Sequence, residues 1–119
     1  MELVTLESAK LYLRVDSADE DALISILLSS SMIIVRDVAR MTASEWNNMI
    51  EFNSEDEDAE LTIRDYTYSN LEATQLRELI RTATLYALGY LFEHREAADY
   101  HDLTMTLGYL LFAVREGAF

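Results

Sequence analysis

The sequence predicts an all-α protein, a small bundle of about five helices, two long and two or three short, with an irregular acidic central segment. Three observations support this fold class. The chain has no proline and only three glycines, so it lacks the usual turn residues of an all-β fold. Apolar residues recur at helical spacing over most of its length. Thr42 with Glu45, and Ser69 with Glu72, form the pattern of a helix capping box.

Two helices are predicted in the first third of the chain. Thr5 is a suitable N-cap for a short helix over about residues 6–13, and the helix dipole favours Glu7 in its first turn. The acidic run at residues 16–21 combines capping side chains with negative charge, which predicts a long helix over about residues 18–39. This helix carries apolar residues on two faces, more than one amphipathic stripe requires.

The central part, from about residue 41 to residue 68, is the least regular. The capping box at Thr42 predicts a short third helix that contains Trp46 and Met49. The charge run at residues 53–58 is typical of a solvated loop. The alternating residues 61–63 are compatible with a short strand, but we expect no partner strand for them, so a helical turn or an irregular segment is equally acceptable.

The clearest predicted helix follows Ser69 and runs to about Glu96. Apolar residues cover nearly its whole circumference in the last three turns, and a final helix over about residues 102–114 is also apolar on most sides. The tetrapeptide Leu-Gly-Tyr-Leu occurs in both helices. Because glycine in a helix costs about 1 kcal/mol, we interpret Gly89 and Gly108 mainly as small residues that admit a neighbouring helix.

The chain is strongly acidic. Nine Lys and Arg residues against 22 Asp and Glu residues give a formal net charge of -13, which repels phosphate and argues against tight, non-specific binding of nucleic acids. The simplest interpretation is that the charge keeps an apolar chain soluble. A more specific one is an acidic surface past which DNA slides, or one that docks onto a basic partner.

Length and composition also constrain the number of domains and the cellular location of the protein. The length of 119 residues predicts a single domain spanning residues 1–119. The chain has no cysteine, which excludes disulfides, thiolate nucleophiles and cysteine-based zinc sites. The N-terminal residues lack the features of a signal peptide, and we expect no run long enough to span a bilayer. We therefore expect a soluble protein made in the cytoplasm, with no membrane partner.

No residues form a recognisable catalytic or metal-binding motif. His94 and His101 are the only histidines, and their spacing matches no standard ligand pattern, although four acidic residues lie close to them in the sequence. These acidic residues are Glu93, Glu96, Asp99 and Asp102. We interpret the histidines as helix-end residues and expect a protein that is not an enzyme and needs no metal or cofactor.

The apolar helix surface exceeds what a domain of this size is expected to bury. Monomers rarely expose large apolar patches, so the surplus predicts self-association or a partner protein. A closed ring, in which each subunit presents one face to the next, is one form of such an assembly. The residues that we select as candidates for a subunit interface or for packing are Leu85, Leu88, Gly89, Phe92, Tyr109 and Phe112.

Three segments resemble one family. Residues 4–16, with the acidic cap at residues 19–24, resemble the opening of the head-tail connector proteins of tailed phages, also called DNA-packaging adaptors or head completion proteins. Residues 76–97 are similar to a helix of that family that ends in a Tyr/Phe-Glu-x-Arg-Glu type of sequence. Residues 107–115 resemble its leucine-rich last helix, which ends in a basic residue. Residues 41–68 are longer and more acidic than the family pattern.

The resemblance implies a structural subunit of the virion. Such a subunit is all-helical and forms a homo-oligomeric ring, a dodecamer in the virion, between the portal vertex of a phage or prophage capsid and the tail. Its partners are the portal protein and tail or stopper proteins, and DNA passes through the ring without sequence-specific binding. The family has no catalytic residues to transfer to this chain.

The charge suggests how the central segment would contribute to such a ring. An acidic lumen repels DNA and lets it move without sticking. The candidate channel-facing residues are Glu55, Asp56, Glu57, Asp58 and Glu60. Two other functions remain as alternatives. One is an acidic regulatory protein that binds a basic nucleic-acid-binding partner, and the other is a small helical enzyme that uses His94 and nearby acids.

Overall fold

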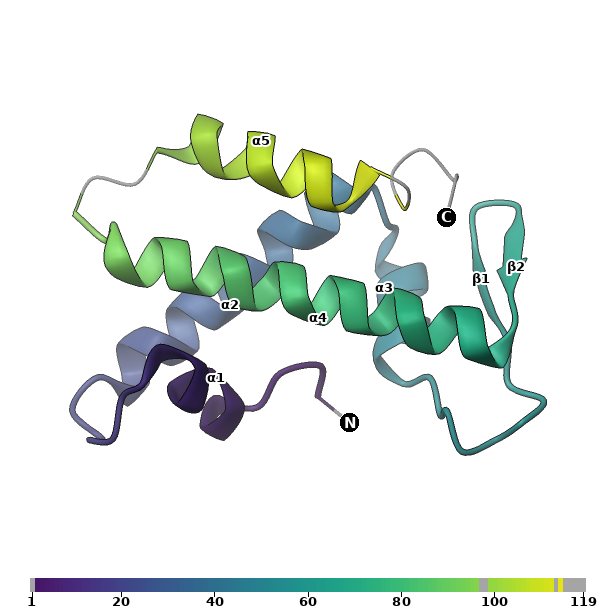
Figure 1. Ribbon diagram of the computed structural model, residues 1–119, viewed down its shortest axis with the longest axis horizontal. Coiled ribbons are helices and arrows are strands. Elements are labelled where there is room, and N and C mark those ends of the chain that lie inside the picture. Colours follow the sequence, from purple (N-terminus) through teal and green to yellow (C-terminus); the bar gives the residue numbers. More distant parts are fainter. Residues whose placement is uncertain (1, 97–98, 113, 115–119) are drawn as a thin grey trace.

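Five helices and one β-hairpin make up the part of the chain that the computed structural model describes, which is residues 2–96, 99–112 and 114 (Figure 1). Helix α1 spans Leu6–Leu13 and begins as predicted at Thr5, whose hydroxyl accepts a hydrogen bond of 3.1 Å from the backbone N–H of Ser8. It ends at Arg14, which has a left-handed φ of 60°.

Helix α2 spans Asp21–Ala39 and starts three residues later than predicted. The acidic run before it forms a turn, in which the backbone N–H of Asp19 donates to the hydroxyl of Ser17 over 3.1 Å. Glu20 occupies the N-cap but makes no side-chain capping hydrogen bond, so the expected cap is absent at this residue. Only Asp21 contributes negative charge to the first turn.

Helix α3 spans Ala43–Ile50 and confirms the first predicted capping box. The hydroxyl of Thr42 accepts from the backbone N–H of Glu45 over 3.1 Å, and the Glu45 carboxylate accepts from the backbone N–H of Thr42 over 2.9 Å. Both donors would otherwise lack partners at the helix start.

The expectation that residues 61–63 have no partner strand is wrong. Strand β1, Leu61–Ile63, pairs antiparallel with β2, Tyr66–Tyr68, across a two-residue turn. Thr62 and Thr67 face each other, and their hydroxyls lie 2.9 Å apart. The hairpin is stable in this setting because Leu61, Ile63 and Tyr68 are buried against the helices.

The two C-terminal helices are α4, Asn70–Glu93, and α5, Tyr100–Leu110. The second capping box is confirmed, since Ser69 and Glu72 exchange hydrogen bonds in both directions. Helix α4 ends at Glu93 instead of Glu96. Helix α5 begins two residues earlier than predicted, after Asp99, whose carboxylate accepts from the backbone N–H of Asp102 over 3.1 Å.

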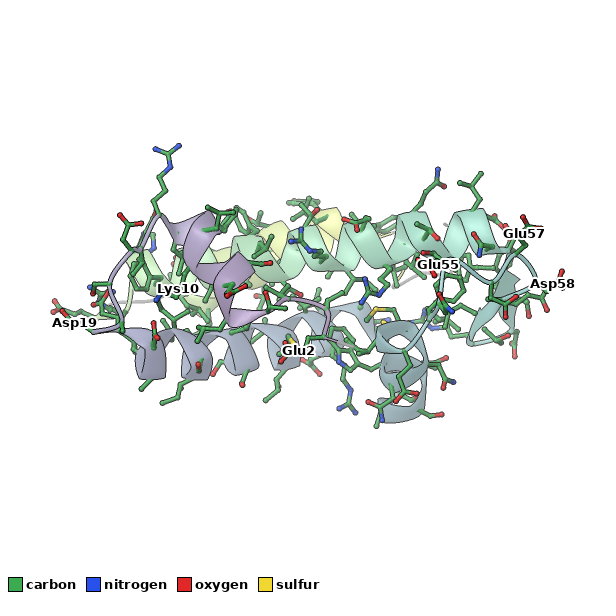
Figure 2. All side chains as sticks on the ribbon, turned by 90° about the horizontal axis from the view of Figure 1, so that it is seen from below. Glu2, Lys10, Asp19, Glu55, Glu57 and Asp58 are labelled. Atoms are coloured by element: carbon green, nitrogen blue, oxygen red, sulfur yellow. The ribbon has the colours of Figure 1, made fainter. Side chains whose placement is uncertain are left out.

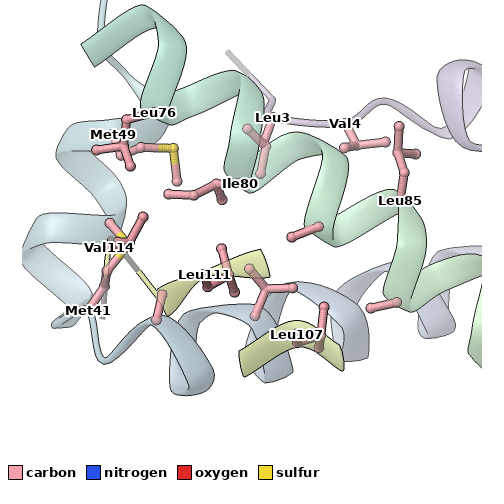
Figure 3. Packing of buried hydrophobic residues seen from close by; sticks show 14 of the residues in the cluster. Leu3, Val4, Met41, Met49, Leu76, Ile80, Leu85, Leu107, Leu111 and Val114 are labelled. Atoms are coloured by element: carbon pink, nitrogen blue, oxygen red, sulfur yellow. The ribbon is translucent and has the colours of Figure 1, made fainter. Parts of the chain in front are cut away.

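Helix α4 lies at the centre of the bundle. It passes between α5 and α1, with α2 crossing behind it (Figure 1), and it contacts α1, α2, α3, α5 and β2. Figure 3 shows Leu76, Ile80 and Leu85 of α4 in the resulting core, together with Leu107 and Leu111. Most of the apolar side chains of α4 are therefore buried within one chain, whereas Leu71 and Tyr86 remain exposed.

Helix α2 meets the length and apolar composition of a membrane-spanning helix, contrary to our expectation that no run would reach that length. It is the one described helix that does so. Its buried residues, including Ile24, Leu28 and Val35, face the bundle, and the helix packs on α1, α4 and α5. Packing on the bundle accounts for the apolar residues on one face of α2, whereas Ile26 and Ile33 on the opposite face are exposed.

Candidate assembly surfaces

The outer face of α5 carries an apolar stripe that faces solvent. Met105 and Tyr109 are four residues apart and lie along one side of α5, and Phe112 follows just after the helix ends at Leu110. Their exposed fractions are 47%, 77% and 54%, respectively. The opposite side carries Leu103, Leu107 and Leu111, which are fully buried. We call Met105, Tyr109 and Phe112 the α5 stripe.

Helix α2 carries a second exposed apolar pair. Ile26 and Ile33 are seven residues apart and thus lie on one side of the helix, with exposed fractions of 63% and 68%. They lie opposite the buried Ile24, Leu28 and Val35. In Figure 1, α2 crosses behind α4 and its C-terminal end reaches α5, so the two apolar surfaces lie on different helices that contact each other.

The predicted interface or packing residues divide into two groups. Leu85 and Leu88 are buried in the core, so they serve packing inside the chain. Gly89 also serves packing, because a β-carbon built there would lie 3.2 Å from Cε2 of Tyr12 on α1. Phe92 is half-buried, and the Arg95 guanidinium lies 4.5 Å above its ring. Tyr109 and Phe112 remain candidates for an interface, as part of the α5 stripe.

The candidate channel-facing acidic residues form an exposed loop with hydrogen bonds to α4. Glu55, Asp56, Glu57, Asp58 and Glu60 are all exposed. The side-chain amide of Asn70 at the start of α4 donates to the backbone carbonyls of Ser54, over 3.0 Å, and Asp56, over 2.8 Å. Within the loop, the backbone N–H of Asp58 donates to the Asp56 carboxylate over 3.1 Å. The loop therefore has a defined anchor on α4.

The acidic loop lies at one end of the molecule, and a second acidic turn lies at the other. Figure 2 shows Glu57 and Asp58 at one end of the long axis and Asp19 at the opposite end. Among the described residues, the two ion pairs are Lys10–Asp21 at 2.7 Å and Arg95–Glu20 at 3.5 Å. Both are at the end that carries Asp19. No described basic side chain pairs with residues 55–60.

Arg64 in the hairpin turn joins four parts of the chain. Its guanidinium donates to the backbone carbonyls of Ala39 and Arg40 at the end of α2, over 3.1 and 3.2 Å, and to the carbonyl of Val114. Its backbone N–H donates to the Glu45 carboxylate at the start of α3. Arg64 also has a left-handed φ of 55°. Sequence reasoning missed this junction, because none of its contacts is local.

The Arg64 junction changes the ionisation of Glu45. Burial of the carboxyl group favours its neutral form, but hydrogen bonds from the backbone N–H groups of Arg64 and Thr42 and from the Thr42 hydroxyl outweigh this effect. The pKa of Glu45 is consequently lower than its ordinary value of 4.5. The ionised carboxylate therefore stabilises the contact between α3 and the hairpin.

A cavity of about 750 Å³ lies where the end of α1, the last turns of α4 and the start of α5 meet. Four of its ten lining residues are Tyr or Phe, among them Tyr12, Tyr86 and Tyr90, and Gly89 lies in the same wall. The carboxylates of Glu93 and Asp102 also line it. Its volume is in the range of small-ligand pockets. Sequence analysis did not find this cavity, since its residues come from three helices.

The two histidines do not form a metal site with the described residues. The His94 ring stacks on Tyr90, with 4.2 Å between ring centroids, and its Nδ1 lies 2.9 Å from the Tyr90 carbonyl oxygen. No group of three His, Asp or Glu side chains within the described residues is arranged to hold a metal ion. His94 caps the C-terminus of α4, which is the role expected for it.

Comparisons with known proteins add no assignment. The chain matches no family model, no curated protein and no solved structure. Its candidate surfaces must therefore be interpreted from their own chemistry and from the resemblance of residues 4–16 with 19–24, 76–97 and 107–115. Of these segments, Ala97, Ala113 and Arg115 lie outside the described residues.

Proposed function

We propose that this protein is a structural assembly subunit, a head-tail connector of a tailed phage or prophage that joins the portal vertex to the tail as a ring. The observation that carries the proposal is the α5 stripe. Apolar side chains there are as regularly spaced as those of the core, yet they face solvent, which is typical of a surface covered by another protein.

The second apolar surface supports a ring over a symmetric dimer. In a head-to-tail contact, a surface of one subunit meets a different surface of the next, so each subunit needs two complementary patches. The α5 stripe and the pair Ile26 and Ile33 are two such patches on separate helices. In our proposal the subunits form a dodecamer at the head-tail junction of the virion, where portal and tail or stopper proteins bind the two rims.

The acidic loop supports a place for this ring along the path of DNA. Residues 55–60 have no basic partner among the described side chains, so no ion pair neutralises their negative charge. A polyanion is repelled by such a surface and does not adhere to it. In our proposal the loop faces the channel. Neither DNA binding nor catalysis is part of this role.

Negative-stain imaging tests the assembly. The purified protein is imaged alone and after mixing with the portal protein encoded in the same genome. We expect rings, either free or seated on portal rings. A protein that remains monomeric in both samples contradicts the proposal. Portal and capsid genes upstream, with tail genes downstream, would support it independently.

Charge reversal tests the channel. Replacing Glu55, Asp56, Glu57 and Asp58 by lysine is expected to slow DNA ejection or to impair genome retention in assembled particles, because DNA would adhere to the lumen. The control reverses Asp16 and Asp19 at the other end of the subunit. Unchanged ejection and retention in the loop variant would show that the loop does not face the DNA.

An acidic regulatory protein remains the alternative function, because the uncompensated loop could also bind a basic nucleic-acid-binding protein by mimicking phosphate charge. Such a regulator would be a monomer or a dimer. Visible rings exclude this alternative. Salt-sensitive binding of a basic protein, without ring formation, would favour it over the connector.

A further inference from the structure

We propose that the cavity between α1, α4 and α5 is a binding site for an arginine side chain presented by a partner protein. This inference goes beyond the proposed function and does not rest on it. The cavity is lined by Tyr12, Tyr86 and Tyr90, and two of these rings are accessible, with exposed fractions of 49% for Tyr12 and 37% for Tyr86. The faces of such rings attract cations.

The charge of the cavity wall also selects a cation. Glu93 and Asp102 line the cavity, and neither carboxylate has a hydrogen-bond or ion-pair partner among the described residues. Arg14 is the one Lys or Arg residue in the wall, so the carboxylates outnumber it two to one. The whole chain, with its formal charge of -13, attracts a cationic partner over a longer range.

The helices hold these groups in place. Tyr86, Tyr90 and Glu93 are spaced by four and three residues and therefore lie on one side of α4. The Tyr90 ring is fixed by stacking on His94, and its hydroxyl accepts from the backbone N–H of Asp99 over 3.3 Å. Gly89 has no side chain that could fill the space next to the Tyr12 ring. The site is thus largely preformed.

The choice of arginine over lysine follows from geometry. A planar guanidinium stacks on aromatic rings and can donate two parallel hydrogen bonds to a carboxylate, whereas an ammonium group is a compact point charge. The chain already uses this chemistry at the edge of the cavity. There, the Arg95 guanidinium lies 4.5 Å above the Phe92 ring and 3.5 Å from a carboxylate oxygen of Glu20.

Nuclear magnetic resonance titration with two capped tripeptides tests the site. The probes are acetyl-Gly-Arg-Gly-amide and its citrulline counterpart, which keeps the shape of arginine but lacks the charge. We expect saturable shifts of the Tyr12, Tyr86 and Tyr90 ring signals with the arginine peptide, and at least about tenfold weaker binding of the citrulline peptide. Equal binding of both peptides, or no saturable shifts at millimolar concentrations, overturns the proposal.

Two variants place the binding at this cavity. Tyr86→Leu removes an accessible ring, and Glu93→Gln removes a surface charge without changing shape, so at least the second variant is expected to fold normally. Each variant is expected to weaken binding of the arginine peptide severalfold, and the two substitutions together are expected to weaken it by about tenfold or more. Tyr66→Leu, on the distant hairpin, is the matched control and should bind like the wild type. Equal weakening by Tyr66→Leu, or none by the two cavity variants, contradicts the assignment.

Discussion

Glu45 uses its two carboxylate oxygens for two different purposes. Oε1 accepts from the backbone N–H of Thr42 and completes the capping box, and Oε2 accepts from the backbone N–H of Arg64 in the hairpin turn. The first contact could be predicted from the spacing of Thr42 and Glu45. The second could not, because it joins residues 19 positions apart and depends on the left-handed conformation of Arg64.

Glu45→Gln is expected to lower the melting temperature at neutral pH, because an amide has one acceptor oxygen for two donors. A lost hydrogen bond of this kind costs about 1 kcal/mol. The lowered pKa of Glu45 means that its ionised form contributes stability above pH 4.5 and that this contribution is lost as the pH falls through the folded-state pKa. The difference in melting temperature between Glu45→Gln and the wild type should therefore shrink below about pH 4.5. Thermal unfolding of both proteins from pH 7 to pH 3 measures this difference.

The control for Glu45 is Glu51→Gln, which changes the same charge at the exposed end of α3. We expect this variant to follow the wild type closely. A Glu45→Gln defect that is equally large at pH 3 and pH 7 would show that the charge of Glu45 contributes nothing.

Arg64→Leu is expected to destabilise the fold by about 1–3 kcal/mol, since the carbonyls of Ala39, Arg40 and Val114 lose a charged donor. Arg14→Leu is the matched control, because Arg14 also has a positive φ, of 60°, but no side-chain hydrogen bond among the described residues. Urea unfolding compares the two. If both variants lose the same stability, the effect arises from the backbone conformation and not from the guanidinium.

At the scale of elements, local signals were sufficient for the helices and insufficient for the hairpin. Thr5, Thr42 and Ser69 occupy the predicted N-caps. The hairpin was missed because its turn residues, Arg64 and Asp65, lack the Asn-Gly type of signal that usually marks such turns. The sequence left open whether Leu85 and Leu88 serve an interface or internal packing, and their burial depends on the helices that pack around α4.

The two faces of the last helices should respond differently to truncation. Leu88→Ala on α4 is expected to cost about 2–5 kcal/mol, because Leu88 is fully buried and its removal leaves a cavity. Tyr109→Ala on the α5 stripe should change the stability of the monomer by less than about 0.5 kcal/mol, because Tyr109 is 77% exposed. Urea unfolding in dilute solution measures both. A large loss for Tyr109→Ala would assign the stripe to internal packing.

At the scale of the molecule, the fold is a thin body of 42 × 30 × 20 Å with an acidic loop at one end and an acidic turn at the other. Net charge and the apolar surplus were both visible in the sequence. The sequence did not show where the surplus lies. Most apolar residues of α4 are buried, and large exposed ones occur on every helix except α3, including regularly spaced ones on α2 and α5. The resemblance to connectors had already suggested assembly, and the structure supplies specific surfaces with which to test it.

The central claim is that the α5 stripe is the contact between copies of this chain, and sedimentation velocity over a concentration series tests it most directly. The wild type is expected to shift to larger species as its concentration rises. Tyr109→Asp should weaken this association, and the double variant Met105→Asp with Tyr109→Asp should remain monomeric. The control Tyr66→Asp, on the hairpin, should associate like the wild type. Association that is unchanged in the Tyr109 and Met105 variants would contradict the claim, and so would a wild type that stays monomeric both at every concentration and after mixing with the portal protein.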